Sequence, residues 1–600
     1  MSRAVGIPEL VARAAPGVTE QARLALLDTR TLGVPGWDAG AISLRNGGRA
    51  WVSGYCFAGA EPQLGRELAE AVSAALAAPD VGAALTALNG SFCAVLVSAA
   101  RDRVDVVTDR FGTRAPYYAL EGDRLLVGED FWALCNALAA PTLSVDAAVE
   151  LLTFDYVMGE HTLVEQIRDV PGATHVAFRV DPLNGAAVLA SRECHWRHDI
   201  RPEARPPADM VAELGEIFGR MSQRYGALAR NMGVGTVGLN LTAGSDSRTI
   251  ACLLDQAGVR MHCFTSTWVR SESASALAVA QALGCPHTAL PFWALGTTVP
   301  CPAIFWALAP TTMFTIANHI IGLATFGHDA ADALVSGHFG DPVACGQMTL
   351  PEFARRGAGR AVLTKLMERF HVCWRPPALR PFLRAPHADA AERAVEHLRT
   401  LCREAPATHD LGMCPQVDLE QRQRRLVLRD YLAQRQLTES FLPLHDNEFI
   451  DFFGRVPFEW IAGRALYYSA LHEHLFVGRR RGLAGIPING ERSHTIRYPV
   501  ARFWWKYMQD RGGAVARRVR RQRRWLGGDG RGVHDLTYAG DGARDGWLAE
   551  LDWLCDVDAL RRLVTANLTN GRFLVYRLWA LYTLARVSAR VRRQEVSPCP

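Results

Sequence analysis

The sequence predicts an α/β protein of two domains: an α+β layered domain over residues 1–200, and a parallel-sheet α/β domain over residues 206–600 that ends in a mainly helical part. Short strands separated by tight turns fill most of the first part. In the second part, single strands alternate with amphipathic helices, which is the pattern of a parallel sheet. A polar, proline-rich stretch at 198–210 separates the two parts and marks the boundary.

The N-terminal pattern is typical of antiparallel strands with helices packed on their faces. The strands include SFCAVLV (91–97), RVDVVTD (103–109) and RLLVGED (124–130), which are rich in β-branched and aromatic residues. Two segments between the strands, 66–78 and 144–154, carry apolar residues at helical spacing. Sheets covered by helices form the layered α+β arrangement.

Composition and charge exclude several classes of protein. A net charge of +5 over 600 residues is too small to predict a nucleic-acid-binding surface. The 14 cysteines are scattered without CxxC pairs, which indicates a reducing compartment and no structural zinc. The start lacks the features of a secretion signal, and polar residues interrupt the most apolar stretch, 302–326. We therefore expect a cytoplasmic protein with neither nucleic acid nor a membrane as a partner.

The strongest local signal is a loop between a strand and a helix. The strand TVGLNL (236–241) is followed by TAGSDS (242–247) and then by a helix with one apolar face. Unpaired N–H groups at a helix start bind anions, so we expect a pyrophosphate here, with magnesium held by Asp246. The candidate ligands of the pyrophosphate are Leu241, Thr242, Gly244, Ser245 and Ser247. In the alternative reading, Asp246 or Ser247 is only the N-cap of the helix.

A second loop of the same kind supports the prediction of a phosphate-binding site. The apolar segment 333–335 ends in SGHFGDP (336–342), which again combines glycines with a carboxylate. Ligands of open parallel sheets bind beyond the carboxyl ends of the strands, so Asp246 and Asp341 are expected to share one magnesium ion on a nucleotide. Further candidate ATP ligands are Ser336, Gly337 and, at the end of another strand, Ser266.

These motifs resemble those of the class B asparagine synthetase family. Its phosphate loop reads Ser-Gly-Gly-x-Asp-Ser and its second loop Ser-Gly-x-Gly-x-Asp. Downstream, Glu439-Ser440-Phe441-Leu442-Pro443-Leu444-His445-Asp446 is similar to its Glu-x-Arg-x-Pro-Phe-Leu-Asp segment. The resemblance implies an ATP pyrophosphatase domain that uses ATP and Mg²⁺ to convert a carboxylate into its acyl-adenylate, which an amine then captures as an amide. Ala243 departs from the family glycine, and a positive φ there would be incompatible with alanine.

The N-terminal part resembles the glutamine amidotransferase half of the same family. The similarity rests on LNGSFCAVLV, on RVDVVTD, and on Asp109-Arg110-Phe111-Gly112 before Pro116-Tyr117-Tyr118. Glutaminase chemistry in the family needs a cysteine at the processed amino terminus, whereas this chain begins Met1-Ser2-Arg3. We therefore expect a degenerate, inactive glutaminase domain and an amine that arrives on the substrate.

Within the superfamily, the loops look most like those of lasso peptide cyclases. Thr-x-Gly-x-Asp-Ser-Arg and Ser-Gly-His-x-Gly-Asp-Pro carry this similarity, together with the length of the chain. The resemblance implies macrolactam formation in a precursor peptide, with a leader-binding protein and a leader peptidase as further partners.

Two residues are candidates for general acid–base catalysis. His338 stands where β-lactam synthetases carry a tyrosine that serves the attacking amine, and the alternative is that it only fills space beside the nucleotide. Glu420 lies where relatives place a carboxylate near the base, and the alternative is a helix pair with Arg424.

The sequence motifs leave two alternative functions open. The late lysines that relatives use to stabilise negative charge are missing, and Arg492 and Arg497 are the nearest cations. The enzymatic alternative is an asparagine synthetase-like or β-lactam-synthetase-like enzyme that acts on a small substrate. The other alternative is a nucleotide-binding pseudoenzyme without catalysis.

Overall fold

The computed structural model describes most of the chain, and all structural statements below concern the described residues. Those residues are 26–32, 34–266, 270–290, 302–312, 330–344, 357–435, 438–461, 464–488, 546–570 and 575–593. Met1, Ser2, Arg492 and Arg497 lie outside them, as does the side chain of Asp341.

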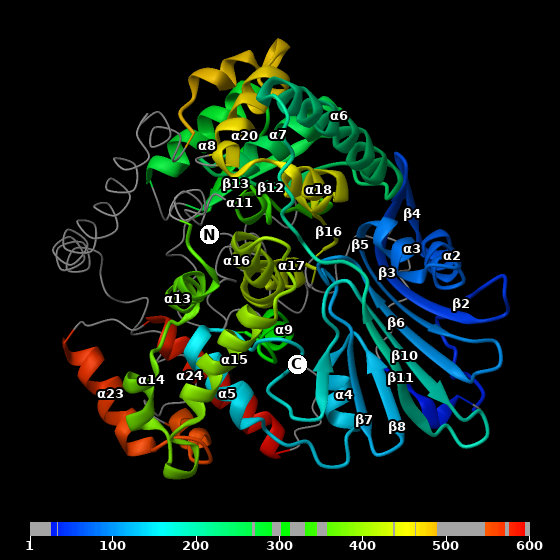
Figure 1. Ribbon diagram of the computed structural model, residues 1–600, viewed down its shortest axis with the longest axis vertical. Coiled ribbons are helices and arrows are strands. Elements are labelled where there is room, and N and C mark those ends of the chain that lie inside the picture. The colour runs from blue at the N-terminus through cyan, green and yellow to red at the C-terminus, as the bar shows by residue number, and fades with distance from the viewer. Residues whose placement is uncertain are drawn as a thin grey trace, which may run out of the picture.

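The N-terminal domain is built from two antiparallel sheets (Figure 1). The larger sheet has the order β11-β10-β6-β5-β3-β2, with β4 paired to β3, and the smaller has the order β1-β8-β7-β9. The strands are β1 (Leu27–Asp28), β2 (Ile42–Ser43), β3 (Arg49–Ala58), β4 (Glu61–Leu64), β5 (Asn89–Val97), β6 (Arg103–Thr108), β7 (Tyr117–Glu121), β8 (Arg124–Gly128), β9 (Ile167–Asp169), β10 (Thr174–Val180) and β11 (Ala187–Cys194).

The core of this domain lies between its two sheets and between the larger sheet and helix α2, because apolar residues alternate along the strands. Val95, Val106 and Phe178 of the larger sheet pack against Tyr118 and Val127 of the smaller one. Helix α2 covers the other face of the larger sheet with Leu68, Ala69 and Val72, and this confirms the layered α+β prediction. The helices of the domain are α2 (Gly65–Leu76), α3 (Val81–Ala87), α4 (Phe131–Ala137) and α5 (Val145–Phe154).

The second domain contains a parallel sheet of order β14-β13-β12-β15-β16, as the strand–helix alternation predicts. Its strands are β12 (Val237–Asn240), β13 (Met261–Ser266), β14 (His287–Leu290), β15 (Ala333–Val335) and β16 (Ser440–Phe441). Helices next to the sheet are α6 (Pro207–Asn231), α7 (Ser245–Gln256), α8 (Arg270–Leu283), α11 (Gly340–Val343), α18 (Asn447–Arg455) and α20 (Ala465–Ala470).

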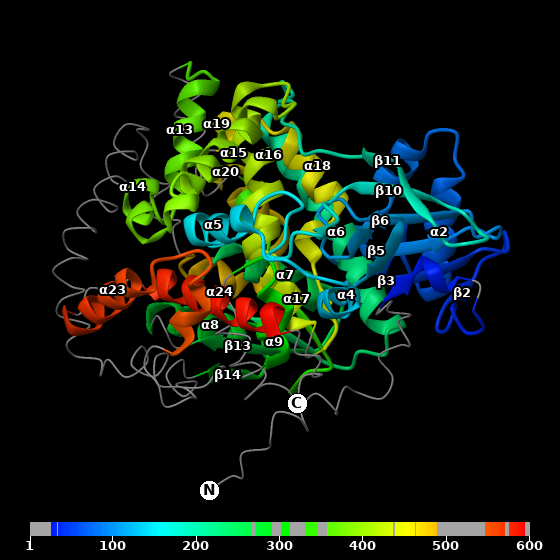
Figure 2. The ribbon, with the colours of Figure 1, turned by 90° about the horizontal axis from the view of Figure 1, so that it is seen from below.

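The described chain after residue 357 is mainly helical, with β16 as an exception. Helices α15 and α24 pack against α5 of the N-terminal domain, and Figures 1 and 2 both show this contact. The remaining elements are α9 (Pro302–Leu308), α13 (Arg360–His371), α14 (Pro376–Leu379), η5 (Arg380–Phe382), η6 (Ala385–His387), α15 (Ala390–Glu404), η7 (Asp410–Gly412), α16 (Met413–Asp418), η8 (Leu419–Val427), α17 (Arg429–Gln434), η9 (Pro443–His445), α19 (Phe458–Ile461), η11 (Leu471–Leu475), η12 (Gly478–Gly485), η14 (Gly546–Leu551), α23 (Val557–Asn570) and α24 (Val575–Arg593). Among the described helices, none has the length and apolar character needed to cross a bilayer.

A buried ion pair and a buried hydrogen bond join the two domains along the segment 439–446. Arg114 of the N-terminal domain lies 2.8 Å from Glu439 at the start of β16, and their side chains are 0% and 2% exposed. At the other end of the segment, Asp446 accepts hydrogen bonds from Asn89 and Arg224. Glu439 and Asp446, at the two ends of this segment, therefore hold the domains together.

Removal of the Glu439 charge is expected to destabilise the protein. Glu439→Gln leaves Arg114 without its carboxylate, which costs on the order of 3–5 kcal/mol for a fully buried pair. Burial raises the pKa of Glu439, but Arg114 and Arg435 outweigh that effect and hold it at about 2. The stabilisation is therefore complete above the ordinary pKa of 4.5 and is lost as the pH falls towards about 2.

Thermal unfolding of the Glu439→Gln variant measures this contribution. The difference in Tm from the wild type should be constant at neutral pH and shrink below pH 4.5. The matched control is Glu404→Gln, because Glu404 is exposed on α15. Equal Tm values for the two variants at neutral pH would contradict the prediction.

Candidate active site at two strand ends

The two predicted loops follow neighbouring strands of the parallel sheet. β12 pairs with β15 in parallel register, with Val237 opposite Ala333 and Leu239 opposite Val335. From β12 the chain continues to β13 and β14 on one side, whereas β15 and β16 lie on the other side. The strand order therefore reverses between β12 and β15, and ligands of open α/β sheets bind at such a switch point.

The loops are in direct contact beyond the strand ends. A methyl group added to the Gly340 backbone would lie 2.3 Å from Asp246 Cγ, so the glycine backbone packs directly on this carboxylate. A methyl group on Gly337 would lie 3.6 Å from the backbone nitrogen of Ser247. Asp341 follows Gly340 at once, so its backbone is beside Asp246. The structure thus brings the two acidic loops together, as the sequence predicts.

The first loop is closed by its own hydroxyl groups. The backbone N–H of Thr242 donates to Ser247 Oγ at 3.1 Å, and the N–H of Gly244 donates to Thr242 Oγ1 at 3.1 Å. Gly244 is the N-cap of α7, and no described side chain caps this helix start. The alternative that Asp246 or Ser247 is the N-cap is therefore wrong. The first-turn N–H groups of α7 remain available to an anion.

Alanine is compatible with the loop at position 243. In the part of the chain that the structure describes, the residues other than glycine with positive φ are Arg101, Asp155, Ala173, Phe339 and Arg464, so Ala243 is not in the left-handed region. Its methyl group is 4% exposed and packs into the interior. The departure from the family glycine therefore introduces no backbone strain at this loop.

Arg464 stands beside Asp246 and was not identified from the sequence. Its Nη1 donates to Ser245 Oγ at 2.6 Å and lies 3.3 Å from Asp246 Oδ1. Burial raises the pKa of Asp246, whereas Arg464, Ser245 and Tyr467 act to lower it. Arg464 has a φ of +58°, and such strain is often found at functional sites. This arginine is therefore the candidate for the cation that relatives supply as lysine.

Loss of the Arg464 cation is expected to slow turnover by on the order of 10²-fold, because a fixed positive group no longer faces the developing negative charge. The variant is Arg464→Gln, and the measurement is the rate of pyrophosphate release. Arg479→Gln is the control, since Arg479 pairs with Asp255 at the opposite end of α7. A rate for Arg464→Gln equal to that of the control would remove Arg464 from the site.

Three other predicted ligands lie at the strand ends in different settings. Leu241 is fully buried and its N–H donates to Phe264 O, so it offers no free donor to a phosphate. Ser336 is 6% exposed, and its Oγ accepts a hydrogen bond from the backbone N–H of His338. Ser266 ends β13, where its backbone pairs with Leu290.

His338 lies in the second loop next to a second, fully buried histidine. Burial lowers the pKa of His445 well below its ordinary value, and the nearby His338 adds to this effect. Both ring nitrogens of His445 are buried and have no hydrogen-bond partner among the described residues. Phe339 packs on His445 at 3.9 Å between ring centroids and has a φ of +75°. In the sequence, His445 is recognisable only as part of the segment 439–446.

Glu420 lies in an interdomain cavity of about 480 Å³. Its carboxylate accepts hydrogen bonds from Arg197 at 3.2 Å and Gln416 at 3.3 Å, while Arg424 donates to Asp169. The predicted helix pair between Glu420 and Arg424 is therefore replaced by a pair with Arg197. The cavity adjoins the second loop through Phe111, which lines it and whose ring lies 4.6 Å from that of Phe339.

The chemistry of the two loops suits magnesium bound to a nucleotide. Among the described side chains there is no group of three or more metal-binding residues. An ion here would therefore take its ligands from Asp246, Asp341 and phosphate oxygens, which is a donor set that Mg²⁺ prefers.

Comparison with known families agrees with this geometry. Residues 226–463 match the family described as asparagine synthase. This segment is therefore similar to an asparagine synthase domain. This domain includes both strand-end loops, and members of its family bind ATP, normally with Mg²⁺. Residues 70–184 match the glutamine amidotransferase domain family, and the two matches together support a likeness to the asparagine synthetase superfamily.

Two solved structures have a weak likeness to part of this chain. The allosteric regulatory enzyme of purine biosynthesis is 10% identical over 42% of this chain and 62% of its own, with a TM-score of 0.18. Glutamine phosphoribosylpyrophosphate amidotransferase from B. subtilis is 13% identical over 42% and 73%, also with a TM-score of 0.18. Among curated proteins, no sequence matches significantly.

Proposed function

We propose that the protein is an ATP-dependent, AMP-forming amide synthetase that closes a macrolactam ring in a lasso precursor peptide. The contact of Gly340 with Asp246 carries the proposal, because it places the two acidic loops at one switch point of the sheet. ATP would lie with its phosphates over the start of α7 and with magnesium between Asp246 and Asp341.

The proposed reaction has two steps at this site. The substrate carboxylate attacks the α-phosphorus of ATP, which forms the acyl-adenylate and releases pyrophosphate. The amino terminus of the same peptide then attacks the acyl carbon, which forms the amide and releases AMP. Arg464 would stabilise the negative charge of the phosphates, and His338 would take the proton of the attacking amine.

Product analysis tests the proposed function. The full chain is incubated with Mg-ATP and leaderless peptides that have a free amino terminus and an Asp or Glu side chain at varied spacing. We expect release of AMP and pyrophosphate, and a peptide that has lost one water and resists aminopeptidase. Amide formation only with a free amino acid and ammonia would contradict peptide cyclisation. Absence of AMP and pyrophosphate with every substrate would indicate a pseudoenzyme.

His338→Ala is expected to abolish amide formation while ATP still binds, since the imidazole acts on the amine and not on the phosphates. The measurements are ATP affinity by calorimetry and amide yield by mass spectrometry. The control is His472→Ala, because His472 lies on η11 and its ring packs on Phe476. Unchanged amide yield in His338→Ala would exclude the assignment.

A further inference from the structure

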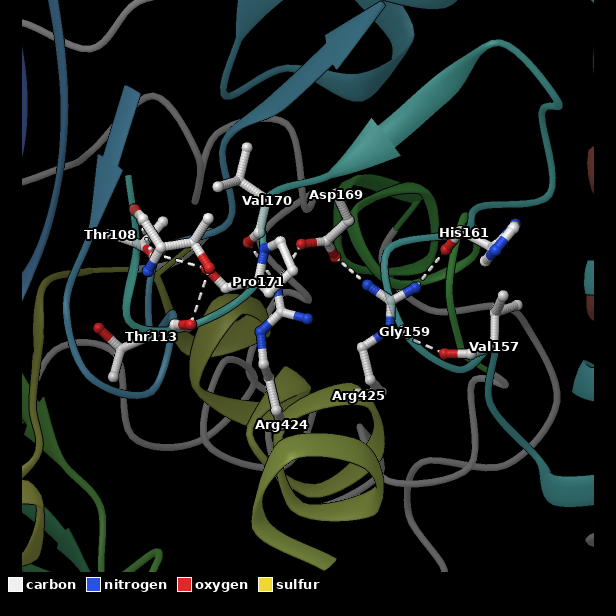
Figure 3. Close-up of polar contacts among 12 residues, drawn as sticks. Thr108, Thr113, Val157, Gly159, His161, Asp169, Val170, Pro171, Arg424 and Arg425 are labelled. Atoms are coloured by element: carbon white, nitrogen blue, oxygen red, sulfur yellow. Dashed lines mark hydrogen bonds and ion pairs between the residues drawn. The ribbon is translucent and has the colours of Figure 1, made fainter. Parts of the chain in front are cut away.

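Three buried arginines converge on one buried aspartate where the N-terminal domain meets the helical part. Arg424 and Arg425 of η8 and Arg429 of α17 all donate to the Asp169 carboxylate. Figure 3 shows Arg424 and Arg425 reaching Asp169 from the same helix. None of the four side chains is more than 4% exposed. Three guanidinium charges thus face one carboxylate, and Asp169 alone leaves a positive excess in the interior.

Several guanidinium donors of this cluster have no acceptor within the described part of the chain. Arg424 Nε and the Nε and Nη1 atoms of Arg429 are buried and make no hydrogen bond there. Arg424 Nη2 donates to Asp169 and to the carbonyl oxygen of Val170, and no hydrogen bond to a described residue involves its Nη1. Burial lowers the pKa of Arg424 and Arg425, the latter to about 9, in spite of the attraction to Asp169.

Arg424 also lines the interdomain cavity that contains Glu420. Three other arginines of the cavity wall each have a carboxylate close by. Arg110 pairs with Asp451, Arg192 with Glu160, and Arg197 with Glu420. Arg424 differs from them because it shares its carboxylate with two other arginines. The rings of Phe111 and Trp196 form an apolar part of the wall of the same cavity.

We propose that this cavity is a binding site for an oxyanion, either a carboxylate or a phosphate, which Arg424 holds with the help of Arg197. A guanidinium group offers parallel donors that match two oxygens of such an anion. The site differs from the strand-end loops, because Phe111 and Phe339 pack between them. The ligand would contact both domains and so stabilise the folded protein in proportion to its occupancy. The proposal does not depend on the amide-forming reaction.

Thermal unfolding of the full chain with added anions tests the site. Mg-ATP is kept at saturation so that the strand-end loops are occupied, and sodium phosphate and sodium acetate are each compared with sodium chloride at equal ionic strength. We expect phosphate or acetate to raise the Tm saturably, by more than chloride does. The two salts distinguish a phosphate site from a carboxylate site.

Arg424→Gln is the decisive variant. It is expected to weaken the anion response by about tenfold or more, because a charge-assisted hydrogen bond is lost. Its Tm without added anion should not fall below that of the wild type, because Asp169 keeps two arginines and the positive excess decreases. The matched control is Arg403→Gln, which removes a 57% exposed arginine outside the cavity and should keep the full response.

An unchanged anion response in Arg424→Gln would overturn the proposal, and so would a chloride response as large as those of phosphate and acetate. If Arg424→Gln does not fold, Arg197→Gln takes its place, since the Arg197 side chain is 44% exposed and is not part of the buried cluster. It should weaken the response by about threefold. A response equal to that of Arg403→Gln would then reject the site.

Discussion

Asp246→Asn is expected to reduce pyrophosphate release by on the order of 10²–10³-fold while the fold stays intact, because this carboxylate is a proposed ligand of the magnesium ion on the phosphates. Asp341→Asn is expected to act in the same way from the neighbouring loop. The measurements are AMP and pyrophosphate release as a function of Mg²⁺ concentration, together with the Tm. Excess Mg²⁺ should restore part of the lost rate.

The control for Asp246→Asn is Asp209→Asn. Each aspartate is the acidic residue of the first turn of its helix, Asp209 in α6 and Asp246 in α7, so both variants lose the same favourable interaction with the helix dipole. Asp209 is exposed and belongs to neither strand-end loop. Full activity in Asp246→Asn, or an equal loss in both variants, would refute the two-loop site.

Gly340→Ala is expected to lower turnover by about 10²-fold with little change in stability, because a displacement of about 1 Å of a catalytic group has an effect of this size. The added methyl group would lie 2.3 Å from Asp246 Cγ, so the carboxylate has to move. Arg464 and Ser245 hold the present position of the carboxylate, and its displacement changes the proposed metal site more than the core. Turnover at saturating ATP and the Tm are measured together.

Gly337→Ala is the matched control, because it adds the same methyl group to the same loop. Its nearest neighbours would be at 3.6 Å and 3.7 Å, which are ordinary van der Waals distances. Neither glycine has a positive φ, so backbone strain does not distinguish the two variants. A similar loss of activity in both variants would mean that the contact with Asp246 is not what positions the carboxylate.

The sequence predicted the two strand-end loops because the signal is local. A strand, a loop with small and hydroxyl residues, and a helix follow one another within 236–258, and a second apolar segment ends in the same way at 336–342. The rule that parallel strands end at one edge of the sheet then brings Asp246 and Asp341 together. The layered N-terminal domain was predictable for the same reason, from alternating strands and one-faced helices.

Arg464, His445 and the arginines around Asp169 could not be predicted in their roles. Arg464 lies 218 positions after Asp246 in the chain, and no periodic pattern links the two. Asp169 and Arg424 are 255 positions apart and come from different domains. The partner of Glu420 was predicted within its own helix, but the structure supplies Arg197 from 223 positions away.

The amino-acid sequence by itself determined which segments become strands and that two of the strands end in acidic loops, and it predicts a nucleotide with magnesium at these loops. Only the tertiary structure decided which cation stands beside Asp246, which carboxylates are used to join the domains, and that three arginines share one buried aspartate. The physical reason is the separation along the chain over which each interaction acts. Backbone hydrogen bonding and hydrophobic periodicity act between residues a few positions apart, so they produce a pattern that can be recognised in the sequence. Charge pairing acts through space and depends on how the domains pack.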